Sequence, residues 1–207
     1  MRTRIKICGI TRLEDARAAI ASGVDALGFI FWEPSPRYID PELARSLVAE
    51  AGPFVATVGV FVNPGRDEVE RALRGSGISM LQFHGDESPE FCASFGRPYL
   101  KAFKPAKEVD LIKSASRHSA AAGWLFDAFD DRQVGGTGET FDWNLVPRPL
   151  ARPLVLSGGL GVDNIGRAVR EVRPYAVDVS SGVEIAKGIK DAAKIAAFVQ
   201  GVRNADQ

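Results

Sequence analysis

The sequence predicts a single α/β domain in which eight parallel strands close into a (β/α)8 barrel. Short apolar runs alternate with amphipathic helical patterns along the chain, and this alternation implies parallel strands joined by right-handed crossovers. The runs lack an apolar/polar alternation, which is typical of strands covered on both faces. No low-complexity linker or shift in composition divides residues 1–207, so we expect one domain.

Eight strand-containing segments are expected in chain order, at 5–8, 25–31, 54–61, 78–85, 99–104, 123–129, 152–159 and 175–182. Helices are expected where apolar residues recur with a helical period, at 13–23, 41–52, 65–77, 88–96, 162–172 and 189–202. Residues 107–123 have a poor apolar period, so a helix there is left open. Eight such units favour a TIM barrel, although 207 residues are few for that fold, and a doubly wound open sheet is the alternative.

The charge balance and the apolar pattern exclude several classes of function. Lys plus Arg is 26 and Asp plus Glu is 26, so no net basic field exists to hold nucleic acid or an anionic membrane. No run approaches the roughly 20 apolar residues of a membrane span, and no secretory signal is apparent. With only Cys8 and Cys92 present, we expect free thiols in a reducing compartment and a cytoplasmic location.

In a closed barrel the carboxyl ends of all strands open at one face, which carries the chemistry of barrel enzymes. The ends of the predicted strands and the loops after them place these residues there: Cys8, Arg37, His84, Asp127, Gly158, Gly159, Ser180 and Ser181. The last two loops, "LSGGL" and "VSSGVE", suit a phosphate site, because glycine allows a close backbone approach and serine hydroxyls donate hydrogen bonds. Tight turns without a ligand are the structural alternative.

Four of these residues keep more than one interpretation on position alone. Asp127 leaves an apolar strand, where partial desolvation raises a carboxyl pKa and suits a general acid, but it could equally cap a loop or pair with an arginine. His84 could be a base, a donor to a ligand or a structural residue, and Arg37, held by "EPSPR", could bind a carboxylate or be solvated. Cys8 could be a small buried thiol or a reacting group whose pKa is lowered by Lys6, two residues earlier.

Metal and cofactor chemistry finds little support in the sequence. Only His84 and His118 are present, and neither cysteine has a CxxC partner, so we expect no metal site. The glycine-rich stretch "QVGGTGETFDW", with Gly135, Gly136 and Gly138, could be a lid or a nest of backbone donors.

Seven stretches together resemble the phosphoribosylanthranilate isomerase family of tryptophan biosynthesis. They are "KICGIT", "DALGFIF…SPR", "QFHGDE", "LFDAF", "GGTGETFDW", "LSGGL" and "DVSSGVE", and they span residues 6–184. One departure lies in "VEIAKGIKD", where this family often has a proline before the glycine. The resemblance implies an Amadori rearrangement of N-(5-phosphoribosyl)anthranilate to the 1-deoxyribulose phosphate, with no redox cofactor and no metal.

The resemblance also implies roles for individual residues. Cys8 would be the general base and Asp127 the general acid, while Arg37 would hold the anthranilate carboxylate. Gly158, Gly159, Ser180 and Ser181 would hold the phosphate, and Asp178 and His84 would contact the sugar or order the site. The expected partner is therefore a small phosphosugar substrate, and the oligomeric state is left open. Another phosphosugar isomerase or epimerase, or a non-catalytic barrel that senses phosphorylated metabolites, are the competing readings.

Overall fold

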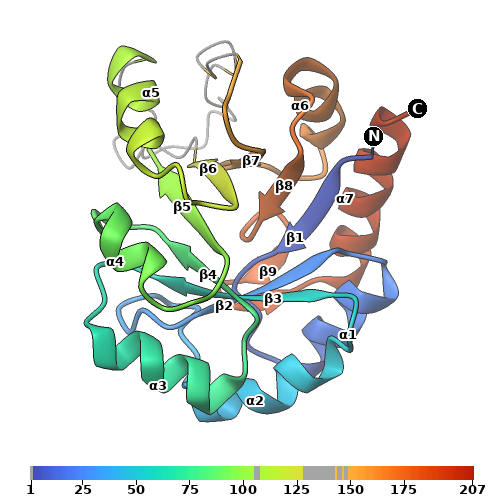
Figure 1. The fold of residues 1–207 in the computed structure, drawn as a ribbon. Coiled ribbons are helices and arrows are strands. Elements are labelled where there is room, and N and C mark those ends of the chain that lie inside the picture. The colour runs from blue at the N-terminus through green and yellow to red at the C-terminus, as the bar shows by residue number, and fades with distance from the viewer. Residues whose placement is uncertain (1, 105–107, 128–142, 144–145, 147–148) are drawn as a thin grey trace.

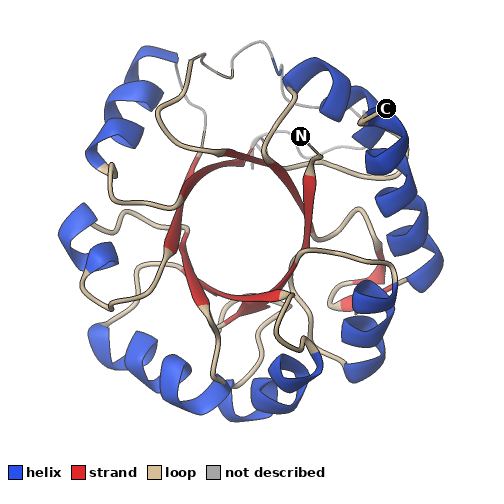
Figure 2. Ribbon diagram, turned by 45° about the vertical axis from the view of Figure 1, so that its right-hand side comes forward, coloured by secondary structure: helices blue, strands red, loops and turns tan. Residues whose placement is uncertain are grey.

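The computed structural model describes residues 2–104, 108–127, 143, 146 and 149–207, which form a closed parallel barrel surrounded by helices (Figure 1, Figure 2). Strands β1 to β8 follow one another in chain order, and β8 pairs in parallel with β1 to close the ring. The predicted barrel is therefore confirmed, and the alternative of an open doubly wound sheet is wrong.

The strands are β1 (Arg4–Ile7), β2 (Ala26–Ile30), β3 (Ala56–Phe61), β4 (Met80–Phe83), β5 (Tyr99–Phe103), β6 (Gly123–Asp127), β7 (Leu154–Ser157), β8 (Ala176–Val179), β9 (Glu184–Ala186) and β10 (Ile189–Lys190). The helices are α1 (Leu13–Ala21), α2 (Pro41–Glu50), α3 (Arg66–Ser76), α4 (Pro89–Ala93), α5 (Glu108–Arg117), α6 (Ile165–Val172) and α7 (Ala192–Ala205). Helix α5 forms in the segment that the sequence left open.

Short polar side chains begin several of these helices. The Asp40 carboxylate accepts from the backbone N–H of Glu42 at 2.8 Å, and the Ser88 hydroxyl accepts from Phe91 at 3.2 Å. Asp191 caps α7 in the same way. Each cap satisfies N–H groups that have no partner within the helix, so the local sequence sets where these helices start.

Several element boundaries differ from those expected, and two of the differences have a clear local cause or consequence. The last helix was expected from residue 189, but Ile189 and Lys190 form β10, which pairs antiparallel with β9. Gly188, at φ 79°, makes the turn between β9 and β10. The helix begins only after its N-cap residue, Asp191. The third strand was expected from residue 54, but it begins at Ala56, and Phe54 is 94% exposed.

The barrel interior contains both an apolar cluster and buried polar side chains. An apolar cluster inside the ring consists of Leu100, Ala102, Leu125, Val155 and Ala176. The polar side chains of Lys6, Gln82 and Asp178 are also buried within the ring of strands. Gly28 makes room for Lys6 and Cys8, because a Cβ atom there would lie 2.8 Å from the Cys8 sulfur and 3.1 Å from Lys6 Cε. The fold thus brings buried polar groups up to the strand ends.

Candidate active site

The structure brings the predicted strand-end residues together at one end of the barrel. Cys8 follows β1, His84 follows β4, and Asp127 is the last residue of β6. Gly158 follows β7 and Ser180 follows β8. Because all these strands are parallel members of one ring, their carboxyl ends open at the same face.

Cys8 is fixed by backbone hydrogen bonds on both sides of β1. Its N–H donates to Val179 O at 2.8 Å, and the N–H of Gly9 donates to Gly28 O at 2.9 Å. Gly9 then turns the chain at φ 74°, a conformation that favours glycine. The Cys8 residue is only 7% exposed, so its thiol is held in a defined and largely dry position.

Lys6 and Asp178 form a buried ion pair beside the thiol. Lys6 Nζ lies 2.8 Å from Asp178 Oδ2, and their side chains are 5% and 4% exposed. Burial raises the pKa of the Cys8 thiol, Asp178 adds to that rise, and Lys6 and Lys190 oppose it without reversing it. Lys6 does lower the pKa of this thiol, as the sequence predicts, but desolvation outweighs the neighbouring cations and the net shift of the pKa is upward.

Arg37 approaches the same end of the barrel and is held by Glu184, a residue that the sequence analysis did not single out. Arg37 Nε and Nη2 donate to the two Glu184 oxygens at 2.8 and 2.7 Å. Lys190 Nζ donates to Glu184 Oε1 at 2.8 Å and also contacts Ser180. Burial alone would raise the pKa of Glu184, but Arg37 and Lys190 hold it below its ordinary value. The carboxylate is thus ionised and doubly paired.

Gly9 also allows this arrangement, because a Cβ atom there would lie 2.7 Å from Arg37 Cδ. The only sequence signal for Glu184 was its place in "DVSSGVE", and Lys190 carried none. The bidentate contact to Glu184 uses Nε and Nη2, which form one edge of the Arg37 guanidinium. A planar fork of this kind can present a second edge to another carboxylate.

Asp127 lies next to His84, and His84 lies next to Gln82. His84 Nε2 is 3.1 Å from Asp127 Oδ2, and the two side chains are 21% and 20% exposed. His84 Nδ1 is 3.4 Å from Gln82 Nε2. The structure therefore brings two predicted site residues into contact and adds Gln82, which sequence reasoning missed.

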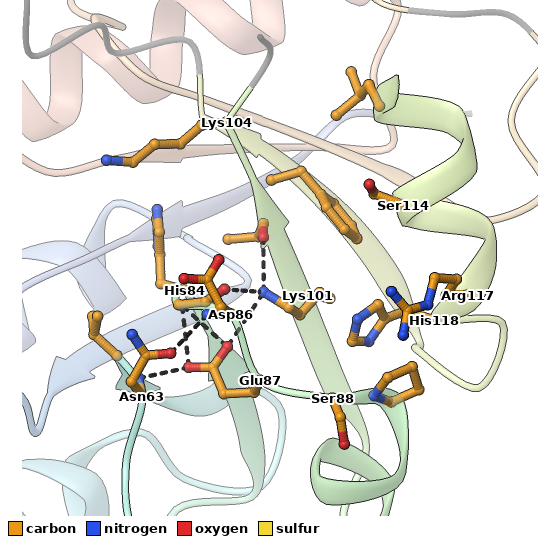
Figure 3. Close-up of a pocket in the computed structure, with 16 residues that line it drawn as sticks. Asn63, His84, Asp86, Glu87, Ser88, Lys101, Lys104, Ser114, Arg117 and His118 are labelled. Atoms are coloured by element: carbon orange, nitrogen blue, oxygen red, sulfur yellow. Dashed lines mark hydrogen bonds and ion pairs between the residues drawn. The ribbon is translucent and has the colours of Figure 1, made fainter. Parts of the chain in front are cut away.

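The loop that carries His84 is fixed by a second buried ion pair (Figure 3). Glu87 accepts from the N–H groups of Asn63 and Gly85, at 2.8 and 3.1 Å. Lys101 Nζ donates to Gly85 O at 2.6 Å and lies 3.3 Å from Glu87. A cavity of about 700 Å3 adjoins this loop, but of the predicted site residues only His84 lines it.

The loops after β7 and β8 approach each other closely. Gly158 and Gly159 have φ values of 86° and 62°, which suit glycine. Gly161 and Gly182 form an isolated parallel bridge between the loops, and a Cβ atom on Gly182 would lie 2.0 Å from Leu160 O. The residues around this bridge, Ser181 among them, line a cavity of about 640 Å3.

Other predictions concern residues or features elsewhere in the chain. The Gly135–Gly138 segment lies outside the described residues. Within the described part, no group of three or more His, Cys, Asp or Glu side chains could hold a metal ion. Both cysteines are free and buried. None of the helices in the described ranges is long and apolar enough to cross a membrane.

A closed parallel barrel with a thiol, a carboxyl, an arginine and two glycine-rich loops at its carboxyl end defines a (β/α)8-barrel enzyme. The model of one protein family, N-(5'phosphoribosyl)anthranilate (PRA) isomerase, matches residues 5–201. The chain therefore belongs to the N-(5'-phosphoribosyl)anthranilate isomerase family, which confirms the resemblance found in the sequence.

Individual relatives agree with this assignment. The N-(5'-phosphoribosyl)anthranilate isomerase of Nitrosospira multiformis is 53% identical over 202 residues, which are 98% of this chain and 97% of the relative. The crystal structure of phosphoribosyl anthranilate isomerase from Thermotoga maritima has a TM-score of 0.89 and 41% identity, covering 98% of this chain and 99% of that one. A further crystal structure, in complex with reduced 1-(o-carboxyphenylamino)-1-deoxyribulose 5-phosphate, has a TM-score of 0.86 and 40% identity with the same coverage.

Proposed function

We propose that this enzyme converts N-(5'-phosphoribosyl)anthranilate to 1-(2-carboxyphenylamino)-1-deoxyribulose 5-phosphate in tryptophan biosynthesis, with Cys8 as general base and Asp127 as general acid. The observation that carries the proposal is the position of the two side chains at the ends of β1 and β6, on one face of a closed barrel. The family and the named relatives supply the substrate.

The reaction needs one proton donor and one proton acceptor and conserves all atoms. Asp127 gives a proton to the furanose ring oxygen, and the bond from that oxygen to C1 breaks to leave an iminium at C1. The iminium acidifies the proton on C2, which Cys8 removes to form an enolamine. Protonation of the enolamine at C1 and loss of the hydroxyl proton at C2 then give the ketone. Each acid or base step of this kind typically contributes about 10²–10⁴-fold to the rate.

The thiol is a base that must be activated during the cycle. Burial raises the pKa of Cys8, so the free enzyme holds mostly the neutral thiol. Lys6 and Lys190 lower that pKa and stabilise the thiolate when it forms. An iminium in the substrate adds a further positive charge close to the atom that must be deprotonated. The active pair, a thiolate with a carboxylic acid, is therefore a minor protonation state.

The anionic ends of the substrate fit the two remaining features of the site. Arg37, oriented by Glu184, would receive the anthranilate carboxylate on its second edge. Gly158, Gly159, Ser180 and Ser181 would receive the phosphate, because the glycines have backbone conformations that favour close approach and the serines carry hydroxyl donors. Asp178 would act indirectly, by holding Lys6 beside the thiol.

An isotope experiment tests the proposal. Substrate carrying deuterium at C2 is given to the wild type, to Cys8→Ala and to Cys92→Ala, while loss of anthranilate-type fluorescence reports turnover. Cys92 is a matched control, since it is equally a buried free thiol but lies on α4. We expect Cys8→Ala to lose both turnover and release of the label while it still binds product.

Two results would contradict the proposal. Release of the label at the wild-type rate in Cys8→Ala would make Cys8 a structural thiol. Binding of the aminoaldose by the wild type without any turnover would favour a sensor. The single-domain organisation and the cytoplasmic location expected from the sequence stay predictions.

A further inference from the structure

Gln82 is a buried amide in the barrel interior with an incomplete set of hydrogen bonds. The residue is 1% exposed, and it pairs in register with Leu100, a member of the apolar cluster inside the ring. Its Oε1 atom has no hydrogen-bond partner within the described residues. Burying an amide group without full hydrogen bonding is unfavourable, so the position of Gln82 calls for a compensating role.

The Gln82 amide nitrogen points to that role. Gln82 Nε2 lies 3.4 Å from His84 Nδ1, and an amide nitrogen can only donate. With the amide in this orientation, His84 Nδ1 is the accepting nitrogen of a neutral ring, and the ring proton is on Nε2. That nitrogen lies 3.1 Å from Asp127 Oδ2, so the ring donates to the carboxyl group.

The opposite arrangement is less favourable. If the amide were reversed, Oε1 would accept a proton from Nδ1, and a neutral ring would then present its bare Nε2 to Asp127 Oδ2. An ionised carboxylate would face that nitrogen with two acceptors and no proton between them. The reversed arrangement is satisfied in two ways, and neither leaves Asp127 with a proton for a substrate. A neutral ring needs Asp127 protonated on Oδ2 and donating to Nε2, which directs the acid's proton away from a substrate. A charged ring donates from both nitrogens, to Oε1 and to an ionised Asp127, which then holds no proton to give.

We propose that Gln82 is a positioning residue that holds His84 as the Nε2–H tautomer, so that Asp127 receives a hydrogen bond on Oδ2 and carries its own transferable proton on the other carboxyl oxygen. The catalytic part of this inference rests on the proposed function of Asp127 as the acid. The tautomer itself depends only on the geometry of the three side chains.

This arrangement favours proton transfer in the direction of the reaction. When Asp127 gives up its proton, the bond from His84 Nε2–H becomes a hydrogen bond to a carboxylate, and charge-assisted bonds of this kind are roughly twice as strong as neutral ones. The backbone of His84 cannot easily move to compensate for a wrong tautomer. Glu87 and Lys101 anchor the next residue, Gly85, through its N–H and its carbonyl.

Nitrogen NMR of protein labelled with ¹⁵N at histidine tests the tautomer without any substrate. The chain has only two histidines, so the spectrum is simple, and His84→Asn assigns the signals. In a neutral ring the protonated and the bare nitrogen resonate far apart. We expect the wild type to show a bare Nδ1 and a protonated Nε2 for His84, while His118 serves as the internal reference.

Two substitutions then test the cause. Gln82→Met keeps the length of the side chain without a donor, and we expect mixed tautomers, a kcat lower by about tenfold to a hundredfold and a KM within about twofold of the wild type. Gln82→Glu accepts instead of donating, so Nδ1 should become protonated. Met80→Leu is the matched control, because Met80 lies two residues earlier on β4 and packs against the interior apolar cluster.

The inference is overturned if Nδ1 of His84 in the wild type is protonated, either alone or together with Nε2. It is also overturned if Gln82→Met retains both the tautomer and the kcat of Met80→Leu. A fall of kcat with an unchanged tautomer would also reject it, since Gln82 would then act by packing alone. If the wild type turned over no aminoaldose, the proposed function would fail, and the NMR result would still decide whether Gln82 sets the tautomer.

Discussion

Replacing Asp178 by Asn should make the protein less stable and its active-site thiol more acidic. Asp178 Oδ2 lies 2.8 Å from Lys6 Nζ, with both side chains almost fully buried. The amide keeps the shape but leaves the Lys6 ammonium without its counterion. Removing one partner of a buried pair typically costs about 3–5 kcal/mol. Since about 1 kcal/mol shifts Tm by roughly 2–4 °C for a domain of this size, we expect Tm to fall by about 6–20 °C.

The thiol should respond in the opposite sense. Asp178 raises the pKa of Cys8 and Lys6 lowers it, so Asp178→Asn should lower the pKa of the thiol. The pH dependence of stability follows from this shift. In the wild type the native thiol has the raised pKa, so its contribution to stability is complete below the unfolded pKa and is lost as pH rises through the folded value. In Asp178→Asn this loss should shrink or reverse.

Thermal unfolding gives Tm, and urea denaturation at several pH values gives the pH dependence of the free energy of unfolding. Thiolate absorbance, measured against Cys8→Ser, gives the pKa of the thiol. Glu50→Gln removes a carboxylate from an exposed pair with Arg17 and should leave Tm close to that of the wild type. The double variant Lys6→Met/Asp178→Leu should recover most of the stability, because apolar side chains can replace a buried pair. A Tm for Asp178→Asn that matches Glu50→Gln, or a thiol pKa that rises, would refute the reasoning.

Three further predictions concern other parts of the site. Glu184→Gln should raise KM by about tenfold or more with little change in kcat, because Arg37 loses a charged bidentate partner. Hydrogen bonds to charged groups contribute roughly 1.5–3 kcal/mol. An unchanged KM in steady-state kinetics would contradict this prediction. The basic limb of the pH profile of kcat/KM should report the thiol of Cys8 and lie above the ordinary thiol pKa of about 8.5, because burial raises the pKa of this thiol. The active enzyme holds one proton between its base and its acid, and that proton is lost only when the pH exceeds the pKa of the thiol. A basic limb below about 8.5 would contradict this prediction. Gly182→Ala should weaken binding of inorganic phosphate and lower Tm by several degrees, because its Cβ would lie 2.0 Å from a backbone oxygen. Gly161→Ala, across the same bridge, meets only ordinary contacts at 3.8 Å and should behave as the wild type in calorimetry.

The fold was predictable because its signal is local and repeated. Each strand is a short apolar run, and most helices have a clear apolar period or an N-cap residue. The alternation of strands and helices can therefore be recognised even where a single boundary is misplaced. The errors occur where local pattern and tertiary context disagree. Ile189 and Lys190 continue the apparent helical pattern, but the turn at Gly188 pairs them with β9 instead. A residue pattern cannot reveal that pairing before the chain folds back.

The sequence could predict which residues lie at the candidate site, but it could not predict which side chains contact each other there. A barrel directs every strand end to one face, so a polar residue after an apolar run could be placed there from the sequence alone. The contact between Arg37 and Glu184 joins residues 147 positions apart, and the contact of Lys6 with Asp178 joins residues 172 apart. Such pairs depend on closure of the ring by β1 and β8, which no short stretch of sequence contains.

The sign of the Cys8 pKa shift shows what this difference means for the chemistry. The sequence reveals a cation two residues away, whereas the fold adds desolvation and a full set of charges around the thiol. Three cations and two carboxylates gather there, namely Lys6, Arg37, Lys190, Asp178 and Glu184. With both carboxylates ionised, this set carries one net positive charge, so a thiolate at Cys8 would bring the cluster to neutrality. Burial keeps the thiol protonated in the free enzyme. The net positive charge of the cluster stabilises the thiolate, which is the form that removes the acidic proton from the substrate.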